Sequence, residues 1–534
     1  ITNKTVAIIG AGASGLTAIK CCLDEGLQPT CYERSEDIGG LWRFCENDIE
    51  GQASIYKSLT INTSKEMMCY SDFSIPEDYP NYMHNSKVME YFRMYAKHFD
   101  LLRYIHFKSR VCSVRRHPDF HINGQWEVVA EIYGKQEAAI FDAVLVCTGH
   151  HVDAYFPLNS FPGVKKFKGE LMHSREYKHS EKFQDQRVLV IGLGNSGADI
   201  SVDLSHVTKQ IFLSTRTGTW VVNRVCDDGY PLDVVHFTRF KNFLRHLLPA
   251  ALVNLWGEKK LNSRFNHENY GIKPQHRFLT RYPIAADDLP NAIIAGRVII
   301  KPNIKEFTER GVIFEDGSSE ENIDVVIFAT GYSYSFPFIE EGVIKTNGNH
   351  IPLYKFVFPP HLKRPTLAII GLLQPLGAIM PISELQARWA TRVFKGLIKL
   401  PSEDMMMADI AKKFQYNNKR YVPSQHISLQ VQYVDHMDEL ASLSGVKPNL
   451  LNLWLTDPRL AWEVFFGPCS PMQFRLSGPG KWEGARNAIL TQEKELSGLQ
   501  KHEPCNHALA AVSLSIFMKV FGCFALFAVI LAYL

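Results

Sequence analysis

A glycine pattern, G-x-G-x-x-G, occurs twice in this sequence and limits the folds open to it more than any other motif. Each copy follows a short apolar run and precedes a helical pattern, as expected for a strand, a tight turn and a helix. The glycines are Gly10, Gly12 and Gly15 after residues 5–9, and Gly192, Gly194 and Gly197 after residues 187–191. Such a turn brings backbone N–H groups and a helix N-terminus close to a pyrophosphate. The pair predicts an α/β fold with two Rossmann-like dinucleotide-binding domains.

The residue after the second strand differs in polarity between the two units. In the first unit, a strand expected at Pro29–Tyr32 delivers Glu33, which lies 18 residues beyond Gly15. A carboxylate there can accept ribose hydroxyl protons. The second unit has Thr215 at the same offset, followed by Arg216, and these side chains suit a 2′-phosphate that a carboxylate would repel. We therefore expect FAD in the first unit and NADPH in the second, although a tight turn without ligand is the alternative for either copy alone.

Two similar segments, DAVLVCTG at 142–149 and DVVIFATG at 324–331, bracket the second unit. In flavoproteins with two dinucleotides, such segments commonly mark where the chain passes between the two domains. The expected parts are a FAD-binding domain at 1–154 and 331–445, an NADPH-binding domain at 155–330 with an inserted amphipathic, substrate-access segment at about 221–320, a C-terminal extension at 446–507 and a membrane anchor at 508–534.

Length and composition point to a large enzyme. A chain of 534 residues exceeds one hydrophobic core, and 46% hydrophobic with 21% charged residues is ordinary for a packed protein. A formal net charge of +3 is too small to argue for nucleic-acid binding. The 11 cysteines contain no C-x-x-C pair, which indicates reduced thiols in a cytosolic environment and argues against a disulfide reductase.

Residues 508–534 are nearly all apolar, with Lys519 as their only charge. At about 1.5 Å per residue, a helix there is long enough to cross a bilayer core of roughly 30 Å. Because a mid-bilayer Lys costs about 2.5–3.5 kcal/mol unless it snorkels, an interfacial helix is the alternative to a spanning one. We expect a C-terminal membrane-anchoring helix, and no secretory signal at residues 1–10.

A second apolar stripe with a basic flank lies at 239–261. It either lies in a membrane interface, where it would feed lipophilic substrates inward, or packs on its own domain. Its apolar members are Phe240, Phe243, Leu244, Leu247, Leu248, Leu252 and Trp256, and its basic members are Arg239, Lys241, Arg245, Lys259 and Lys260.

Several motifs together identify a family resemblance that covers almost the whole chain. They are F-x-G-x-x-x-H-x-x-x-Y at Phe167, Gly169, His173 and Tyr177, the Gly39-Gly40 pair with Trp42, NTSKEM at 62–67, ATGY at 329–332 and QPLGA at 374–378. With them the chain resembles the flavin-containing monooxygenase family, in its vertebrate, microsomal, drug-metabolising branch. We assign His173 and Tyr177 no chemical role and treat them as family markers.

The resemblance implies that NADPH passes a hydride to FAD, that O₂ adds to the reduced flavin, and that a C4a-hydroperoxyflavin awaits substrate. It implies N- or S-oxygenation of small lipophilic amines and sulfides, including xenobiotics, at the endoplasmic reticulum membrane with the catalytic part facing the cytosol. Baeyer–Villiger oxygenation of ketones, an NADPH oxidase releasing hydrogen peroxide and a catalytically idle scaffold stay open as alternatives. The sequence also leaves open whether copies of the chain form a homo-oligomer.

By the same resemblance, Asn62 is the catalytic residue, near the flavin C4a and the retained NADP⁺, where its amide can donate and accept hydrogen bonds. Sequence alone favours a turn residue there. The residues expected to bind FAD are Gly10, Ala11, Gly12, Ala13, Ser14, Gly15, Glu33, Gly40, Leu41, Trp42, Asn62, Thr63 and Gln374. Those expected to bind NADP are Ile61, Gly192, Gly194, Asn195, Ser196, Gly197, Ala198, Asp199, Thr215 and Arg216. For Asp199 the alternative is first-turn helix stabilisation, and no metal site is expected.

Overall fold

The computed structural model describes residues 3–49, 51–345, 350–422 and 429–497. The chain divides into two compact parts, Ile1–Leu490 and Thr491–Leu534. The arrangements below lie within the first part, apart from the end of α15 (Ala485–Ser497), and the word unit is kept for the two nucleotide-binding units. The expected membrane anchor at 508–534 lies outside the described residues. Among the helices of the described ranges, none combines the length and the apolar character needed to span a bilayer.

The first glycine turn (Gly10–Gly15) joins the central strand of a five-stranded parallel sheet to helix α1 (Ala13–Asp24). In spatial order the strands are β20 (Leu367–Ile369), β7 (Ala143–Val146), β1 (Thr5–Ile9), β2 (Gln28–Tyr32) and β3 (Ile105–His106). All four residues of β7 are buried, as expected for a parallel strand covered on both faces. In sequence β20 comes after all strands of the second sheet, whereas the other strands of the first sheet come before them. The first sheet is therefore built from two separate parts of the chain.

The second glycine turn (Gly192–Gly197) occupies the same place in a second five-stranded parallel sheet and leads into α5 (Asn195–Leu204). In spatial order these strands are β14 (Val298–Lys301), β11 (Gln210–Ser214), β10 (Arg187–Ile191), β18 (Val325–Phe328) and β9 (Glu170–His173). The two parallel sheets confirm the predicted α/β class. An antiparallel pair, β8 (Asp153–Ala154) with β19 (Tyr332–Ser333), joins the two passages between the sheets.

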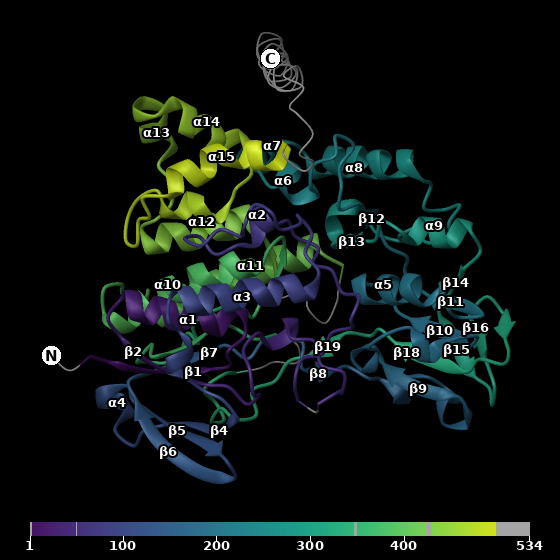
Figure 1. Cartoon of the computed structure of the whole chain (residues 1–534), viewed down its shortest axis with the longest axis horizontal. Coiled ribbons are helices and arrows are strands. Elements are labelled where there is room, and N and C mark those ends of the chain that lie inside the picture. Colours follow the sequence, from purple (N-terminus) through teal and green to yellow (C-terminus); the bar gives the residue numbers. More distant parts are fainter. Residues whose placement is uncertain (1–2, 50, 346–349, 423–428, 498–534) are drawn as a thin grey trace. The chain divides into compact units, whose positions relative to one another are not determined.

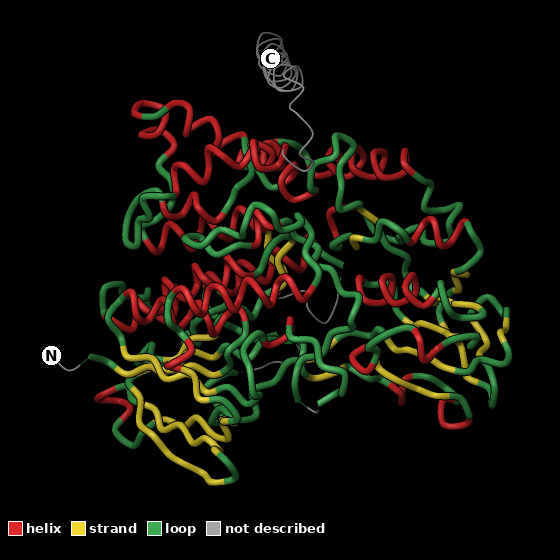
Figure 2. Tube along the Cα trace, viewed as in Figure 1, coloured by secondary structure: helices red, strands yellow, loops and turns green. Residues whose placement is uncertain are grey.

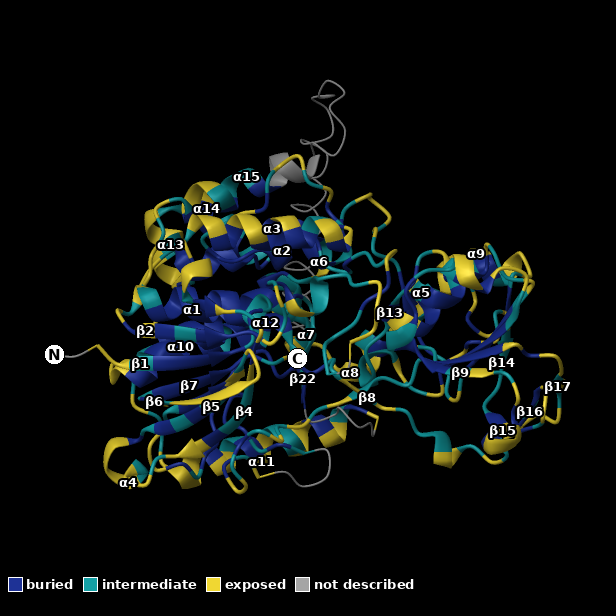
Figure 3. Cartoon of the chain, turned by 60° about the horizontal axis from the view of Figure 1, so that its bottom comes forward, coloured by how far each residue is buried: buried dark blue, intermediate teal, exposed yellow. Residues whose placement is uncertain are grey.

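Helices cover the first sheet, as Figures 1 and 2 show, with α1, α3 (Asn85–His98) and α10 (Met380–Lys395) layered above β1, β2 and β7. The central strands and α10 are dark blue, and therefore buried, in Figure 3. α10 ends at Gly396, whose φ of 86° is the left-handed conformation that commonly terminates helices. This packing leaves the carboxyl ends of the strands, where both glycine turns lie, as the place for ligands.

Between β11 and β14 the chain makes a long insertion. Its elements are β12 (Val221–Val222), α6 (Leu232–His236), α7 (Arg239–Leu247), α8 (Ala250–Arg264), β13 (Ile284–Ala285) and α9 (Leu289–Ile294). The range expected for the inserted segment, about 221–320, therefore also includes β14, which pairs with β11 inside the second sheet. We use "inserted segment" below for residues 215–297.

The expected stripe at 239–261 forms two helices, because Pro249 stands between α7 and α8. Two of its basic side chains do not belong to an exposed flank: Arg239 is buried and pairs with Asp438, and Arg245 pairs with Asp435 at 3.0 Å. These ion pairs attach α7 to the stretch 435–438, so that part of the stripe packs internally.

The remaining elements form smaller sheets, two short helices early in the sequence and a helical region towards its end. They are β4 (Ser109–Arg116), β5 (Trp126–Ile132) and β6 (Lys135–Phe141) in one antiparallel sheet, β15 (Ile304–Phe307), β16 (Val312–Phe314) and β17 (Ser319–Glu320) in another, the pair β21 (Gln374–Leu376) and β22 (Gln430–Gln432), and helices α2 (Lys65–Met68), α4 (Phe120–Asn123), α11 (Glu403–Arg420), α12 (Tyr433–Ser444), α13 (Leu450–Thr456), α14 (Pro458–Phe466) and α15 (Ala485–Ser497).

A buried ion-pair network fixes the chain after α2 onto the first unit. Arg475 pairs with Glu384 of α10 at 2.8 Å and with Asp72 at 3.0 Å, and Lys20 of α1 pairs with Asp72 at 2.5 Å. Burial alone would raise the pKa of Asp72, but Arg475 and Lys20 hold it below its usual value. Removing one partner from such a network typically costs about 3–5 kcal/mol, so the position of Asp72 against α1 is strongly determined.

Candidate cofactor and active site

The first glycine turn is closed by backbone contacts on one side and open on the other. A Cβ on Gly15 would lie 1.9 Å from Gly10 O, and one on Gly10 would lie 2.6 Å from Cys147 O. At Gly12, however, the nearest atom to a Cβ would be Gly40 Cα, at 3.5 Å. Gly12 is the N-cap of α1 and caps it with no side chain, so the first amides of the helix are left for a ligand.

Glu33, directly after β2, contacts this turn. It is buried, its Oε2 accepts a hydrogen bond from Ala11 N at 2.7 Å, and its Oε1 accepts one from Ser35 N at 2.8 Å. The expected FAD residues Ala11, Gly12 and Glu33 are therefore together, with the carboxylate held by backbone amides at the end of β2.

Two later segments, 39–42 and the one with Ser383, approach the same turn, whereas Gln374 is described only in a separate strand pair. Gly39 N donates to Ala11 O at 3.1 Å, which places the 3₁₀ turn Gly40–Trp42 beside Gly12. Ser14 Oγ donates to Ser383 Oγ at 3.1 Å. Gln374 follows at the start of β21, where it pairs with Gln430 of β22 and is half-buried.

The second glycine turn repeats this construction. A Cβ on Gly197 would lie 1.9 Å from Gly192 O, and one on Gly192 would lie 2.5 Å from Ala329 O. Gly194 differs, because beyond its own chain neighbours no heavy atom of the described residues lies within 4 Å of where its Cβ would stand. Gly194, Asn195 and Ser196 are exposed. The turn therefore offers an accessible helix N-terminus, which fits a pyrophosphate.

Two guanidinium groups lie near the end of β11. Thr215 Oγ1 accepts a hydrogen bond from Gly218 N at 3.1 Å, and Arg216 is exposed. Arg281 donates from Nη1 to Thr217 Oγ1 at 2.9 Å. Burial, and then the charge of Arg216, lower the pKa of Arg281. Two neighbouring cations favour an anion between them. Arg281 lies 66 residues after Thr215 and outside any motif of the sequence, so the sequence alone did not predict it.

One stretch of the first unit, residues 54–72, contacts both nucleotide-binding helices, and we call it the bridging segment. Tyr56 donates from Oη to Asp199 Oδ2 of α5 at 2.8 Å. Tyr70 donates from Oη to Ala13 O, in the first turn of α1, at 2.6 Å. In sequence Asn62 lies between these two tyrosines, on a segment that contacts the helices following both glycine turns.

Asp199 does not stabilise the first turn of α5, which contains no acidic residue. That alternative is wrong, because Asp199 comes one turn later and its carboxylate accepts the Tyr56 hydroxyl. Burial raises the pKa of Asp199, while the Tyr56 bond acts in the opposite direction. Asp199 therefore joins α5 to the bridging segment.

Asn62 has the buried polar atom that a ligand would satisfy. Its Oδ1 is buried, and within the described ranges it has no hydrogen-bond partner. Leaving a buried acceptor unpaired costs about 1–3 kcal/mol, so a donor from a bound molecule or water fits this position. The backbone around Asn62 is held at both ends: Ile61 N donates to Met83 O at 2.9 Å and Ser64 N donates to Asp233 Oδ2 at 2.7 Å.

His173 has a structural role. It ends β9 and begins a 3₁₀ turn rather than lying on an α-helix with Tyr177. Burial lowers the pKa of His173 to about 4, so the ring is neutral at physiological pH and lies 3.0 Å from Gly331 O through Nε2. Tyr177 is buried and donates to Asp203 Oδ2 at 2.5 Å.

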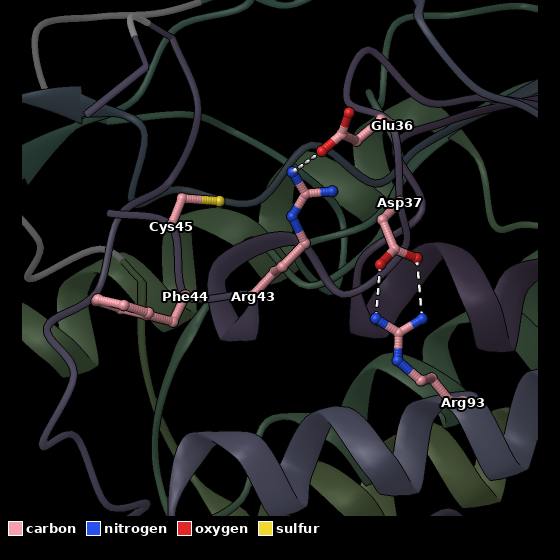
Figure 4. A pocket seen from close by; sticks show the side chains of 6 residues that line it. All are labelled: Glu36, Asp37, Arg43, Phe44, Cys45 and Arg93. Carbon is pink, nitrogen blue, oxygen red and sulfur yellow. Dashed lines mark hydrogen bonds and ion pairs between the residues drawn. The ribbon is translucent and has the colours of Figure 1, made fainter. Parts of the chain in front are cut away.

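Figure 4 shows a pocket next to the 3₁₀ turn at Gly40–Trp42, lined by Glu36, Asp37, Arg43, Phe44, Cys45 and Arg93. Its charges are already paired, since Asp37 accepts from Arg93 at 2.6 and 3.2 Å and Arg43 lies 3.6 Å from Glu36. None of the expected site residues lines it. In the described part of the chain, no group of three His, Cys, Asp or Glu side chains could hold a metal ion.

Comparisons with known proteins agree with this geometry. The family described as flavin-binding monooxygenase-like matches residues 3–534. Flavin-containing monooxygenase 5 of Cavia porcellus is 58% identical over 100% of both chains, and dimethylaniline monooxygenase [N-oxide-forming] 2 of Pan troglodytes is 53% identical over 99% of this chain and 98% of its own. The structure of S-allyl-L-cysteine S-oxygenase from Allium sativum has the same fold, with a TM-score of 0.64 at 23% identity over 97% of this chain and 99% of that one.

Gly194→Ala tests whether the second turn binds a nucleotide. The backbone of Gly194 is extended, with φ −103°, so Ala fits the fold, but its methyl would occupy the space left for the pyrophosphate. Overpacking of this kind costs about 1–3 kcal/mol, so we expect NADP⁺ to bind about tenfold more weakly, with unchanged FAD content and unfolding temperature. Gly197→Ala provides the contrast, since its Cβ would strike Gly192 O and should prevent folding. Undiminished NADP⁺ affinity in Gly194→Ala, measured by titration calorimetry, would exclude this site.

Proposed function

The chain belongs to the flavin-containing monooxygenase family, and on this premise we propose that it transfers oxygen to small lipophilic amines and sulfides. The family uses FAD and NADPH, and the chain is an NADPH- and O₂-dependent flavin monooxygenase. One oxygen atom enters the substrate, the other leaves as water, and NADPH provides the two electrons. When bound, FAD supplies the redox chemistry. The name of the Pan troglodytes relative, which states N-oxide formation from dimethylaniline, supports a soft nucleophile as the substrate.

We propose the following division of labour among the chain's own residues. Residues 1–154 and 331–445 form the FAD domain, in which the amides of the first glycine turn meet the pyrophosphate and Glu33 meets the ribose. Residues 155–330 form the NADPH domain, in which the second turn meets the other pyrophosphate. Thr215, Arg216 and Arg281 receive the 2′-phosphate, since their hydroxyl and guanidinium groups match its charge and hydrogen-bonding capacity.

The observation that carries the proposed catalytic role is the unpaired Asn62 Oδ1. In sequence this residue lies on the bridging segment between Tyr56, which contacts α5, and Tyr70, which contacts α1, and we propose that groups held by either domain reach it. Its amide can accept a hydrogen bond through Oδ1 and donate through Nδ2. We propose that it holds the reactive end of the bound cofactors and keeps activated oxygen from leaving as hydrogen peroxide before substrate arrives.

Asn62→Ala is expected to retain FAD and to consume NADPH, but to release most of the electrons as hydrogen peroxide, because the amide that stabilises activated oxygen is gone. Peroxide released per NADPH oxidised should rise at least about tenfold, since removing one preorganised donor usually slows the step that it assists by about 10²–10³. The ratio is measured with a peroxide-coupled dye beside absorbance at 340 nm. Thr60→Ala, a neighbouring change on the same segment, is the control. Tight coupling in Asn62→Ala would refute the role.

A direct competition among substrates tests the proposed class. An alkyl aryl sulfide, a tertiary amine and a cyclic ketone are supplied together with ¹⁸O₂ and NADPH, and the products are separated by mass spectrometry. We expect label in the sulfoxide and the N-oxide. Labelled ester or lactone in excess would favour Baeyer–Villiger oxygenation instead, and absence of label in every product would leave an NADPH oxidase.

We propose that the enzyme is held at the endoplasmic reticulum membrane by the apolar segment 508–534, with a second contact through α7 and α8. The support for the second contact is a set of large apolar side chains that these helices leave exposed: Phe243, Leu247, Leu248, Leu252, Leu255 and Trp256. Apolar area next to basic residues such as Lys259 favours the interface of an anionic bilayer. A homo-oligomer, which the sequence left open, and the cytosolic orientation stay proposals.

A chain that ends at Glu503 separates the two contacts. We expect it to sediment with anionic lipid vesicles, and Leu252→Ser with Trp256→Ser to lower the bound fraction about fivefold or more, since burial contributes about 1.5–3 kcal/mol per large apolar side chain. Ile122→Ser with Tyr133→Ser removes equally exposed apolar groups elsewhere and should have no effect. If the shortened chain stays in the supernatant without detergent, the second contact does not exist.

A further inference from the structure

Asp233 is a buried carboxylate of the inserted segment that no step described so far uses. It lies in the first turn of α6 and is 3% exposed. Its Oδ2 accepts a hydrogen bond from Ser64 N at 2.7 Å, across 169 residues of chain, and its Oδ1 accepts one from Val234 N at 2.9 Å. A buried carboxylate is costly unless it is hydrogen-bonded, so both oxygens are committed to backbone amides.

The Ser64 amide is one of two fixed points on either side of Asn62. On the N-terminal side, Ile61 N donates to Met83 O at 2.9 Å, within the first unit's own sequence. On the C-terminal side, Ser64 O accepts from Met67 N and Met68 N at 3.1 and 3.0 Å and so begins α2. Asn62 and Thr63 lie between these two nearest fixed points, and beyond them Lys65 N donates to Asn81 O at 2.9 Å. Of these three amides, only that of Ser64 is held by the inserted segment.

The surroundings of Asp233 keep it in place. Tyr82 Oη donates to Arg224 O and accepts from Leu232 N at 3.2 Å, which secures the loop that leads into α6. The ionisable groups facing Asp233 are Tyr82, Cys226 and Tyr433, whose pKa values are all raised, primarily by burial, so they are neutral at physiological pH. Burial raises the pKa of Asp233 to about 6, while the Ser64 amide acts in the opposite direction. The carboxylate is therefore mainly ionised at pH 7.5.

We propose that Asp233 is a positioning residue, which fixes the turn carrying Asn62 through the Ser64 amide and so ties that turn to the inserted segment of the second unit. The inference rests on the proposed function only for its effect on catalysis. The effect of Asp233 on the mobility of the turn can be measured without it. A charged acceptor on a backbone amide forms a stronger and shorter bond than a neutral one, so Asp233 can hold the Ser64 amide more firmly than a carbonyl oxygen would.

The test measures the turn and the chemistry separately in the full-length, FAD-loaded enzyme. In Asp233→Ala, amide hydrogen exchange over residues 61–67 should accelerate about tenfold, because the Ser64 amide loses its acceptor. Asp233→Asn, which keeps the volume and one amide oxygen, should restore part of the protection and serves if the Ala variant does not fold. Asp324→Ala, which removes another carboxylate that accepts from a backbone amide, Arg187 N at 2.8 Å, is the matched control and should leave this stretch unchanged.

Peroxide released per NADPH supplies the second measurement. Asp233→Ala should raise it severalfold. The double variant with Asn62→Ala should release no more peroxide per NADPH than Asn62→Ala alone, because Asp233 acts on coupling only by positioning the Asn62 side chain. If exchange at 61–67 is unchanged in both Asp233 variants, the inference is overturned whatever Asn62 does. If exchange accelerates but Asn62→Ala stays tightly coupled, the proposed function of Asn62 fails while the positioning by Asp233 stands. If the double variant released more peroxide per NADPH than Asn62→Ala alone, by the amount that Asp233→Ala adds to the unchanged enzyme, the inference would also be contradicted.

Discussion

Both nucleotide-binding units depend on a backbone crossing between the end of a central strand and the helix that follows it. Gly15 passes so close to Gly10 O, and Gly197 so close to Gly192 O, that a Cβ at either position would lie 1.9 Å away. Because neither helix could begin there with a side chain, the crossing fixes the direction of α1 and α5 against their sheets. The same crossing aims the amide ends of both helices at the edge where ligands bind.

The two crossings alone do not fix the position of one nucleotide-binding unit relative to the other. The bridging segment contacts both, through the Tyr56 bond to Asp199 and the Tyr70 bond to Ala13 O. The ion-pair network of Arg475, Asp72 and Lys20 then holds the end of this segment on α1. Each bond is between groups that are at least half-buried, so it persists where a surface contact would be lost to water and salt. Electron transfer between two bound nucleotides requires this kind of fixed relation.

Local patterns were sufficient for the strands and turns and insufficient for the contacts between them. The runs at 5–9 and 187–191 and the glycine spacing predicted β1, β10 and their helices, because hydrophobic pattern and turn chemistry act over a few residues. Asp233 and Tyr56 carry no such signal, since their partners Ser64 and Asp199 are 169 and 143 residues away. The alternative role for Asp199 failed for the same reason. The apolar pattern at 239–261 runs across Pro249, where the structure divides it into two helices.

The second-strand contrast that first separated the two nucleotides has a structural counterpart. Glu33 is buried and its two oxygens accept from Ala11 N and Ser35 N, so a 2′-phosphate at that strand end would meet a fixed negative charge. Thr215 instead uses its hydroxyl to close a turn on Gly218 N, with Arg216 exposed and Arg281 nearby. Like charges repel most strongly where water is excluded. The same fold therefore supports opposite preferences for a 2′-phosphate. One strand end carries a buried carboxylate, which disfavours it, and the other carries two guanidinium groups and no carboxylate among the residues named here, which favours it.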